Sequence, residues 1–92
     1  VRGTVMNIDN FANVTLNISD EDLDQINKKT TSILKVKFKD KTISMPLAKT
    51  YGDVSKGSLV AIVYDGYLQL AINIGKFNDA YKLQRGDVVQ IE

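Results

Sequence analysis

The chain has 92 residues, which is enough for a single domain, so we expect any second domain to lie in sequence outside it. A count of 12 basic and 11 acidic residues leaves a net charge of +1, which argues against a dedicated nucleic-acid-binding or membrane-surface protein, because either needs a large excess of Lys and Arg. The absence of cysteine and histidine excludes disulfides, thiolate metal sites and most nucleophile–base pairs.

The beginning of the chain predicts two strands that meet at a corner. The segment RGTVMNID is expected to form the first strand, with Val5 and Ile8 as its apolar positions, and the corner follows at residues 9–13. Beyond it, apolar and polar residues alternate, which is typical of a half-buried strand. The apolar positions of this second strand are Val14, Leu16 and Ile18.

The segment SDEDLDQINKK predicts one short helix. Ser19 is a suitable N-cap, Asp22 follows at the third helical position, and acidic residues in the first turn interact favourably with the helix dipole. We expect Leu23 and Ile26 to face the core. The segment lacks the glycine and the ligand alternation of a calcium loop, so helix capping is the favoured interpretation of its acidic residues.

A regular alternation after Thr31 predicts a half-buried strand with a basic outer face. The apolar positions are Leu34, Val36 and Phe38, and the basic positions are Lys35, Lys37, Lys39 and Lys41. A turn at Asp40–Lys41 is expected to lead into TISMPL, giving a hairpin with Pro46 at its edge or end. The lysine row resembles one that tracks a phosphate backbone, but protection of an exposed strand against aggregation is the favoured interpretation.

The second half of the chain predicts a hairpin, a short helix and a last strand. AKTYGDVSKGS is loop-like, LVAIVY is an apolar strand, Asp65–Gly66 signals a tight turn, and YLQLAINI returns as the partner strand. KFNDAYKL is long enough for a helical turn or two, and QRGDVVQIE is a turn followed by a strand. Together the segments indicate an all-β fold of about seven strands with one or two short helices, a small β-barrel or a sandwich. None of them carries a catalytic constellation.

Two long stretches resemble a known family in order and spacing. RGTVMNIDNFANVTLNI resembles the signature G-x-V-x-x-x-D-x-F-G-N-x-x-T-N-I. TYGDVSKGSLVAIVYDGYLQLAINIGKFNDAYKLQRGDVVQI resembles T-Y-x-D-V-x-x-G-x-L-x-A-x-x-x-S-x-G-x-L-E-I-A-x-N-x-G-x-A, ending in a G-D-x-V strand. On these motifs the sequence is similar to the C-terminal domain of the S-adenosylmethionine (SAM) hydroxide adenosyltransferases, the family that includes the SAM-dependent fluorinase and chlorinase.

The resemblance implies a β-barrel domain over residues 1–92 that follows a larger N-terminal α/β domain absent from this chain. Family enzymes are trimers, and SAM, a substrate rather than a cofactor, binds between one subunit's N-terminal domain and its neighbour's C-terminal domain. Water or a halide attacks the ribose C5′, giving adenosine or a halogenated adenosine plus methionine. The family's catalytic Asp, Arg and His belong to the N-terminal domain, so no catalytic residue and no metal ligand is implied here.

The resemblance also implies an adenine site. The family's adenine-contacting Asn falls on Asn13, whose amide can both donate to and accept from a base edge. The stacking aromatic position falls on Tyr51. The backbone groups that meet adenine fall on Ile72, Asn73 and Ile74, and preformed backbone groups need no side-chain ordering.

The sequence departs from the family pattern at several positions. The Ser and the small or basic residue that contact the methionine carboxylate become Tyr64 and Asp65, and a fixed anion beside a carboxylate costs energy. Ala12 replaces a glycine, so we expect that its φ is not strongly positive. Gln69 replaces a glutamate. The methionine end of the site therefore differs from the family, whereas the adenine end is largely intact.

We therefore expect the C-terminal domain of a SAM-hydrolysing enzyme, with adenine-binding groups and trimer contacts but no activity of its own. Its expected partners are the N-terminal domain and SAM or adenosine, in a homotrimer without membrane or nucleic-acid contacts. The alternatives are a free-standing interaction module that uses the lysine row and a degenerate family member without turnover. No apolar run reaches membrane-spanning length and no signal peptide is apparent, so a cytoplasmic location is expected.

Overall fold

Seven strands close into a barrel in the structure, a computed structural model that describes residues 1–92 throughout. The elements in chain order are β1 (Arg2–Ile8), β2 (Val14–Ser19), α1 (Asp20–Gln25), β3 (Ile33–Phe38), β4 (Lys41–Ala48), the 3-10 helix η1 (Tyr51–Asp53), β5 (Leu59–Tyr64), β6 (Tyr67–Ile72), α2 (Phe77–Tyr81) and β7 (Val88–Ile91). The all-β barrel with two short helices that the sequence predicted is therefore confirmed.

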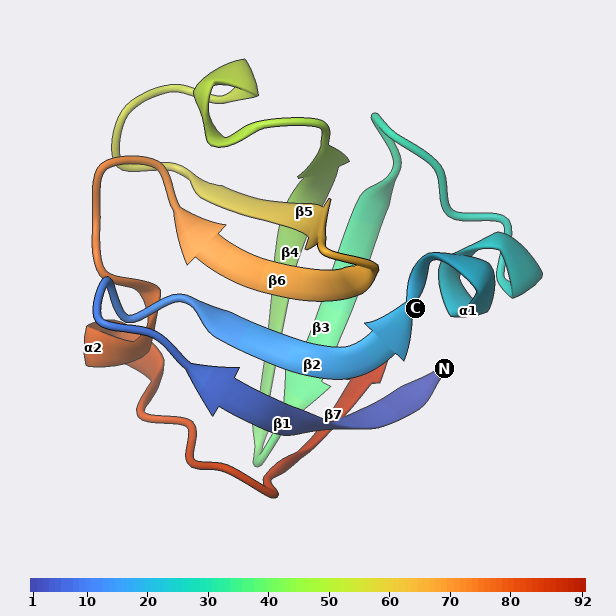
Figure 1. The fold of residues 1–92 in the computed structure, drawn as a ribbon, viewed down its shortest axis with the longest axis horizontal. Coiled ribbons are helices and arrows are strands. Elements are labelled where there is room, and N and C mark those ends of the chain that lie inside the picture. Colours follow the sequence, from blue (N-terminus) through green and yellow to red (C-terminus); the bar gives the residue numbers. More distant parts are fainter.

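The strands follow the order β1-β2-β6-β5-β4-β3-β7 around the barrel, and pairing of β7 with β1 closes it (Figure 1). All neighbouring strands are antiparallel except β4 and β5. Strand β4 lies between β3 and β5: Pro46 is the last residue of its register with β3, opposite Ile33, and Leu47 lies opposite Ala61 of β5. Pro46 thus marks the end of the β3–β4 hairpin, as expected.

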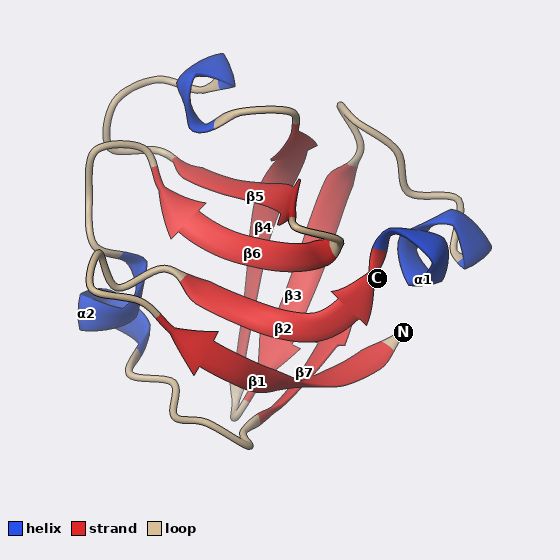
Figure 2. Ribbon diagram, in the orientation of Figure 1, coloured by secondary structure: helices blue, strands red, loops and turns tan.

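The barrel interior is a single apolar cluster of 17 buried residues to which every strand contributes. The helices α1 and α2 lie on opposite sides of the barrel in Figure 2, and they add Leu23 and Phe77 to this cluster. Complete burial of one such side chain stabilises the fold by about 1.5–3 kcal/mol, so packing holds helices that are too short to form alone. Neither helix has the length and apolar character needed to cross a membrane.

The predicted cap of α1 is present in the structure. The backbone N–H of Asp22 donates to Oγ of Ser19 at 3.2 Å, and the backbone N–H of Ser19 donates to Oδ2 of Asp22 at 2.9 Å. Leu23 is fully buried, and Ile26 is half-buried against the core. The reciprocal bonds satisfy donors that the helix leaves open, and the predicted helix is confirmed.

The β3–β4 turn lies one residue earlier than predicted. Phe38 pairs with Lys41, so the turn residues are Lys39 and Asp40 and not Asp40 and Lys41. This register keeps the apolar face of β3 inside the barrel, and the two-residue turn then places Lys39 at a φ of 53°. The predicted alternation of β3, with Phe38 buried and its lysines exposed, is confirmed.

The β5–β6 hairpin has the predicted turn, but its second strand is shorter than predicted. Asp65 and Gly66 have φ values of 52° and 88°, the combination that a tight two-residue hairpin turn requires. Strand β6 ends at Ile72, because Asn73 bonds to the 57–58 loop and Ile74 turns the chain away at a φ of 52°.

Candidate functional site

A pocket of about 250 Å³ lies where the β1–β2 corner, η1 and the end of β6 meet. It is lined by the five residues predicted to contact adenine, and Phe11 and Gly75 complete the lining. The five are Asn13, Tyr51, Ile72, Asn73 and Ile74. They come from three separate segments of the chain, so the structure brings together residues that only the resemblance had grouped.

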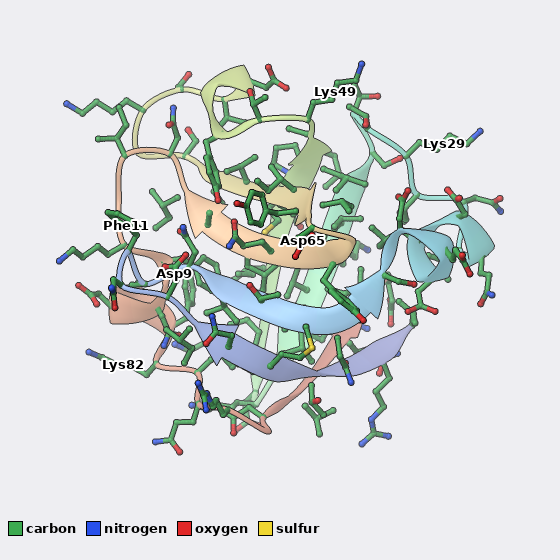
Figure 3. All side chains as sticks on the ribbon, in the orientation of Figure 1. Asp9, Phe11, Lys29, Lys49, Asp65 and Lys82 are labelled. Atoms are coloured by element: carbon green, nitrogen blue, oxygen red, sulfur yellow. The ribbon has the colours of Figure 1, made fainter.

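Asp9 holds the corner that carries Asn13. Its Oδ1 accepts hydrogen bonds from the backbone N–H groups of Phe11 and Asn13, each at 2.9 Å, and its Oδ2 accepts one from Nδ2 of Asn13 at 3.2 Å. Figure 3 shows Asp9 and Phe11 together on the connection between β1 and β2. Oδ1 and the second N–H of Asn13 form no bond within the chain and can meet a ligand. Asp9 is part of the motif D-x-F-x-N, but the sequence alone does not reveal its role.

Ala12 occupies the same corner with a φ of 60°, so the expectation that its φ is not strongly positive is wrong. Its N–H donates to the carbonyl of Asp9 at 3.0 Å, and its carbonyl accepts from the N–H of Asn78 at 2.9 Å. A left-handed conformation costs a residue with a Cβ about 1–2 kcal/mol. The hydrogen bonds on both sides of Ala12 therefore hold the corner in a strained shape.

Tyr51 forms the side wall of the pocket. Its hydroxyl donates to Oε1 of Gln69, and its ring packs on a small apolar cluster outside the barrel, which consists of Val60, Ile62 and Ala71. Burial, followed by the charges of Asp9 and Tyr64, raises the pKa of the Tyr51 hydroxyl above its ordinary value of 10.0. The ring is thus fixed at one end and stays neutral in neutral solution.

The three predicted backbone positions differ in what they can offer a ligand. The N–H and carbonyl of Asn73 bond to Ser58 and Gly57, and its Nδ2 donates to the carbonyl of Val54 at 2.9 Å. The carbonyl of Ile72 accepts from Gly75 at 3.1 Å. Ile74, by contrast, makes no backbone hydrogen bond.

Ile74 is also conformationally unusual. It is β-branched, its φ is 52°, and the residue is 75% exposed. A β-branched residue in the left-handed region is a true outlier, and such strain clusters at functional sites. Ile74 is therefore the backbone position of the pocket that is open to a ligand.

Tyr64 and Asp65 lie outside the pocket, at the opposite end of the β5–β6 hairpin. Ile72 pairs with Leu59 at the pocket end, whereas Tyr64 pairs with Tyr67 next to the turn. Five steps along a strand cover about 17 Å. The structure therefore places these two residues away from Ile72 at the pocket end of the hairpin, although Tyr64 lies close enough to Tyr51 for its charge to act on the Tyr51 hydroxyl.

The lysine row has partners within the chain. Nζ of Lys37 bonds to Oε2 of Glu92 at 2.9 Å, and this hydrogen bond, then the Lys37 charge, lowers the pKa of the Glu92 carboxyl. Nζ of Lys39 donates to the carbonyl of Lys82 at 3.0 Å. The chain has no group of three or more acidic side chains arranged to hold a metal ion.

Comparison with known families decides the relationship. The model of the SAM hydroxide adenosyltransferase C-terminal domain matches residues 3–90. The chain belongs to this family. The resemblance drawn from the sequence motifs is thereby confirmed.

Two solved structures share the fold of this SAM hydroxide adenosyltransferase C-terminal domain. An uncharacterized conserved protein from Thermotoga maritima matches 99% of the chain at 27% identity with a TM-score of 0.94. A conserved hypothetical protein from Thermus thermophilus matches 99% at 24% identity with a TM-score of 0.72, which shows the fold alone. The chain spans 35% and 34% of these two proteins. It is therefore similar to about a third of each.

Proposed function

We propose that this domain supplies the adenine-binding side of a SAM site in a larger enzyme, which converts SAM and water into adenosine, methionine and a proton. The observation that carries the proposal is that Asn13, Tyr51 and Ile74 line one pocket in a chain of this family. Stacking of a base on the Tyr51 ring is worth about 1–3 kcal/mol. The Asn13 amide and the open backbone of Ile74 offer donors and acceptors to the base edges.

The reaction needs groups that this pocket does not contain. Attack of water on the ribose C5′ requires a group that takes up a proton, and Tyr51 is the one titratable side chain in the lining. Its raised pKa keeps it protonated. The catalytic groups would therefore come from the N-terminal domain of the same protein, and the domain by itself would be inactive.

Two exposed apolar side chains beside the pocket support an assembly. Phe11 is 72% exposed and Ile74 is 75% exposed, and both line the pocket. Large exposed apolar residues next to a binding site are typical of an interface. In the proposed homotrimer a neighbouring subunit covers them and closes the SAM site. The cytoplasmic location stays a prediction.

The proposal is tested with the full-length protein that contains this domain. Incubation with SAM should yield adenosine, measured by HPLC. Asn13→Ala should raise KM for SAM by about 5- to 150-fold, the worth of one bidentate amide–base pair. Asn10→Ala, in the same corner but exposed, is the control. An unchanged KM in Asn13→Ala would remove this residue from the site. Titration calorimetry of the isolated domain should show at most weak binding of SAM.

A degenerate family member without turnover is the second candidate, and Asp65 favours it. Asp65 stands at the position where the family pattern places a small or basic residue, and the β5–β6 turn exposes it. A full-length protein that binds adenosine but forms none from SAM would identify this case. A free-standing module that uses the lysine row has less support, because Lys37 and Lys39 are bonded within the chain.

A further inference from the structure

Asp9 is anchored so firmly that its carboxylate has one orientation. Its Oδ1 receives two backbone N–H groups, from Phe11 and Asn13, and its own N–H donates to the carbonyl of Asn13 at 3.1 Å. Hydrogen bonds to a carboxylate are stronger than those between neutral groups. Oδ2 is therefore held in a fixed position against the side chain of Asn13, from which it accepts at 3.2 Å.

This contact fixes which end of the Asn13 amide is nitrogen. A carboxylate only accepts hydrogen bonds, so the group facing Oδ2 must be the NH₂ and not the carbonyl oxygen. A 180° rotation of the amide would place its oxygen against the anion and lose the bond. The remaining N–H and the oxygen Oδ1 of Asn13 therefore keep fixed places in the pocket wall.

A fixed amide distinguishes one class of purine from another. Adenine presents the N6 amino donor beside a ring-nitrogen acceptor, which matches an amide that offers one acceptor and one donor. A 6-oxopurine has an acceptor oxygen at the same position, which would face Oδ1 of Asn13. It would pair only with an amide turned by 180°, and the bond to Asp9 prevents that turn.

We propose that Asp9 is a positioning residue that locks the Asn13 amide and thereby makes this pocket select 6-aminopurine over 6-oxopurine nucleosides. The inference rests on the proposed binding of adenine in the pocket. Asn13, whose amide Asp9 holds, lines the same pocket as Tyr51, so the fixed amide and the stacking ring belong to one site.

The test compares the dissociation constants of adenosine and inosine for the full-length protein by titration calorimetry. Wild type should bind adenosine more tightly than inosine by about 5- to 150-fold, the discrimination of one bidentate amide–base pair. Asp9→Asn keeps an oxygen that accepts from the backbone N–H groups, but its NH₂ can donate to the oxygen of an Asn13 amide rotated by 180°. The ratio of the inosine to the adenosine dissociation constant should therefore fall toward one. Asp87→Asn is the matched control, because Asp87 caps a remote turn by accepting from the N–H of Gln84.

If Asp9 had a purely structural role, its replacement would weaken the binding of both nucleosides equally and leave the ratio unchanged. That result would overturn the positioning role of Asp9 but not the proposed adenine site. Wild type that binds neither nucleoside, or both equally, would overturn the proposed adenine site and the lock with it. Asp9→Ser covers a failure of Asp9→Asn to fold. Its hydroxyl can still accept from the N–H of Phe11, but it is too short to reach the Asn13 amide, so the ratio should again fall.

Discussion

Ala12→Gly should raise the free energy of unfolding, because glycine adopts a φ of 60° without strain. The left-handed conformation costs a residue with a Cβ about 1–2 kcal/mol. Glycine loses about 0.5–1 kcal/mol of this advantage through the larger entropy of the unfolded chain. From the middle of each range the net gain is about 0.75 kcal/mol, which corresponds to a rise in Tm of about 3–6 °C for a domain of this size.

Urea and thermal denaturation of the domain, followed by circular dichroism, measure this change. Ala80→Gly is the matched control, because Ala80 is exposed within α2 and has no positive φ. There the same substitution should lower the free energy of unfolding by about 0.5–1 kcal/mol. The two substitutions should therefore change the free energy of unfolding in opposite directions. A loss of stability in Ala12→Gly would refute it, since the strain would then not reside at this residue.

Two further substitutions test the pocket walls. Tyr51→Phe should lower the free energy of unfolding by about 1 kcal/mol at pH 7, because Gln69 loses its hydrogen-bond donor. This difference should shrink above pH 10, because the pKa of Tyr51 is raised in the folded state and the folded wild type therefore keeps a proton that the unfolded chain releases. Wild type then loses stability as the pH rises, whereas the phenylalanine variant does not. Parallel pH profiles of the free energy of unfolding would contradict the shift. Gly75→Ala would place a Cβ 2.5 Å from Cγ2 of Ile72, which is too close for two carbon atoms. The free energy of unfolding should therefore fall by about 1–3 kcal/mol. An unchanged midpoint of urea denaturation would show that the Ile72 side chain moves away freely.

The strands and turns could be predicted from neighbouring residues in the sequence, but the closure of the strands into a barrel could not. Alternation in β3 and the Asp65–Gly66 turn follow from neighbouring residues, and both are present in the structure. The pairing of β7 with β1 and β3, and the parallel contact of β4 with β5, join segments far apart in the chain. No local pattern encodes such contacts, so the sequence left barrel and sandwich open until the resemblance was considered.

For the site, the sequence indicated which residues take part but not how their atoms are arranged. The resemblance grouped the residues of the pocket, but it did not distinguish Asn73, whose backbone is used within the chain, from Ile74, whose backbone is open. It also missed Asp9, because its role depends on which atom of the Asn13 amide it contacts. The φ of Ala12 was predicted wrongly, because hydrogen bonds from two separate segments hold it in place.

The exposed position of Asp65 limits how much it can oppose a methionine carboxylate. Two like charges about 4 Å apart repel by about 1 kcal/mol in water and by about 4 kcal/mol near a protein surface. Asp65 lies on an exposed turn, where the lower value applies unless a neighbouring subunit excludes water. A hydrogen bond from a cationic side chain to a carboxylate contributes about 1.5–3 kcal/mol. In the proposed SAM site, replacement of a basic residue at this position would therefore weaken the methionine end at least as much as the added anion would, and the groups that restore it would have to come from outside this chain.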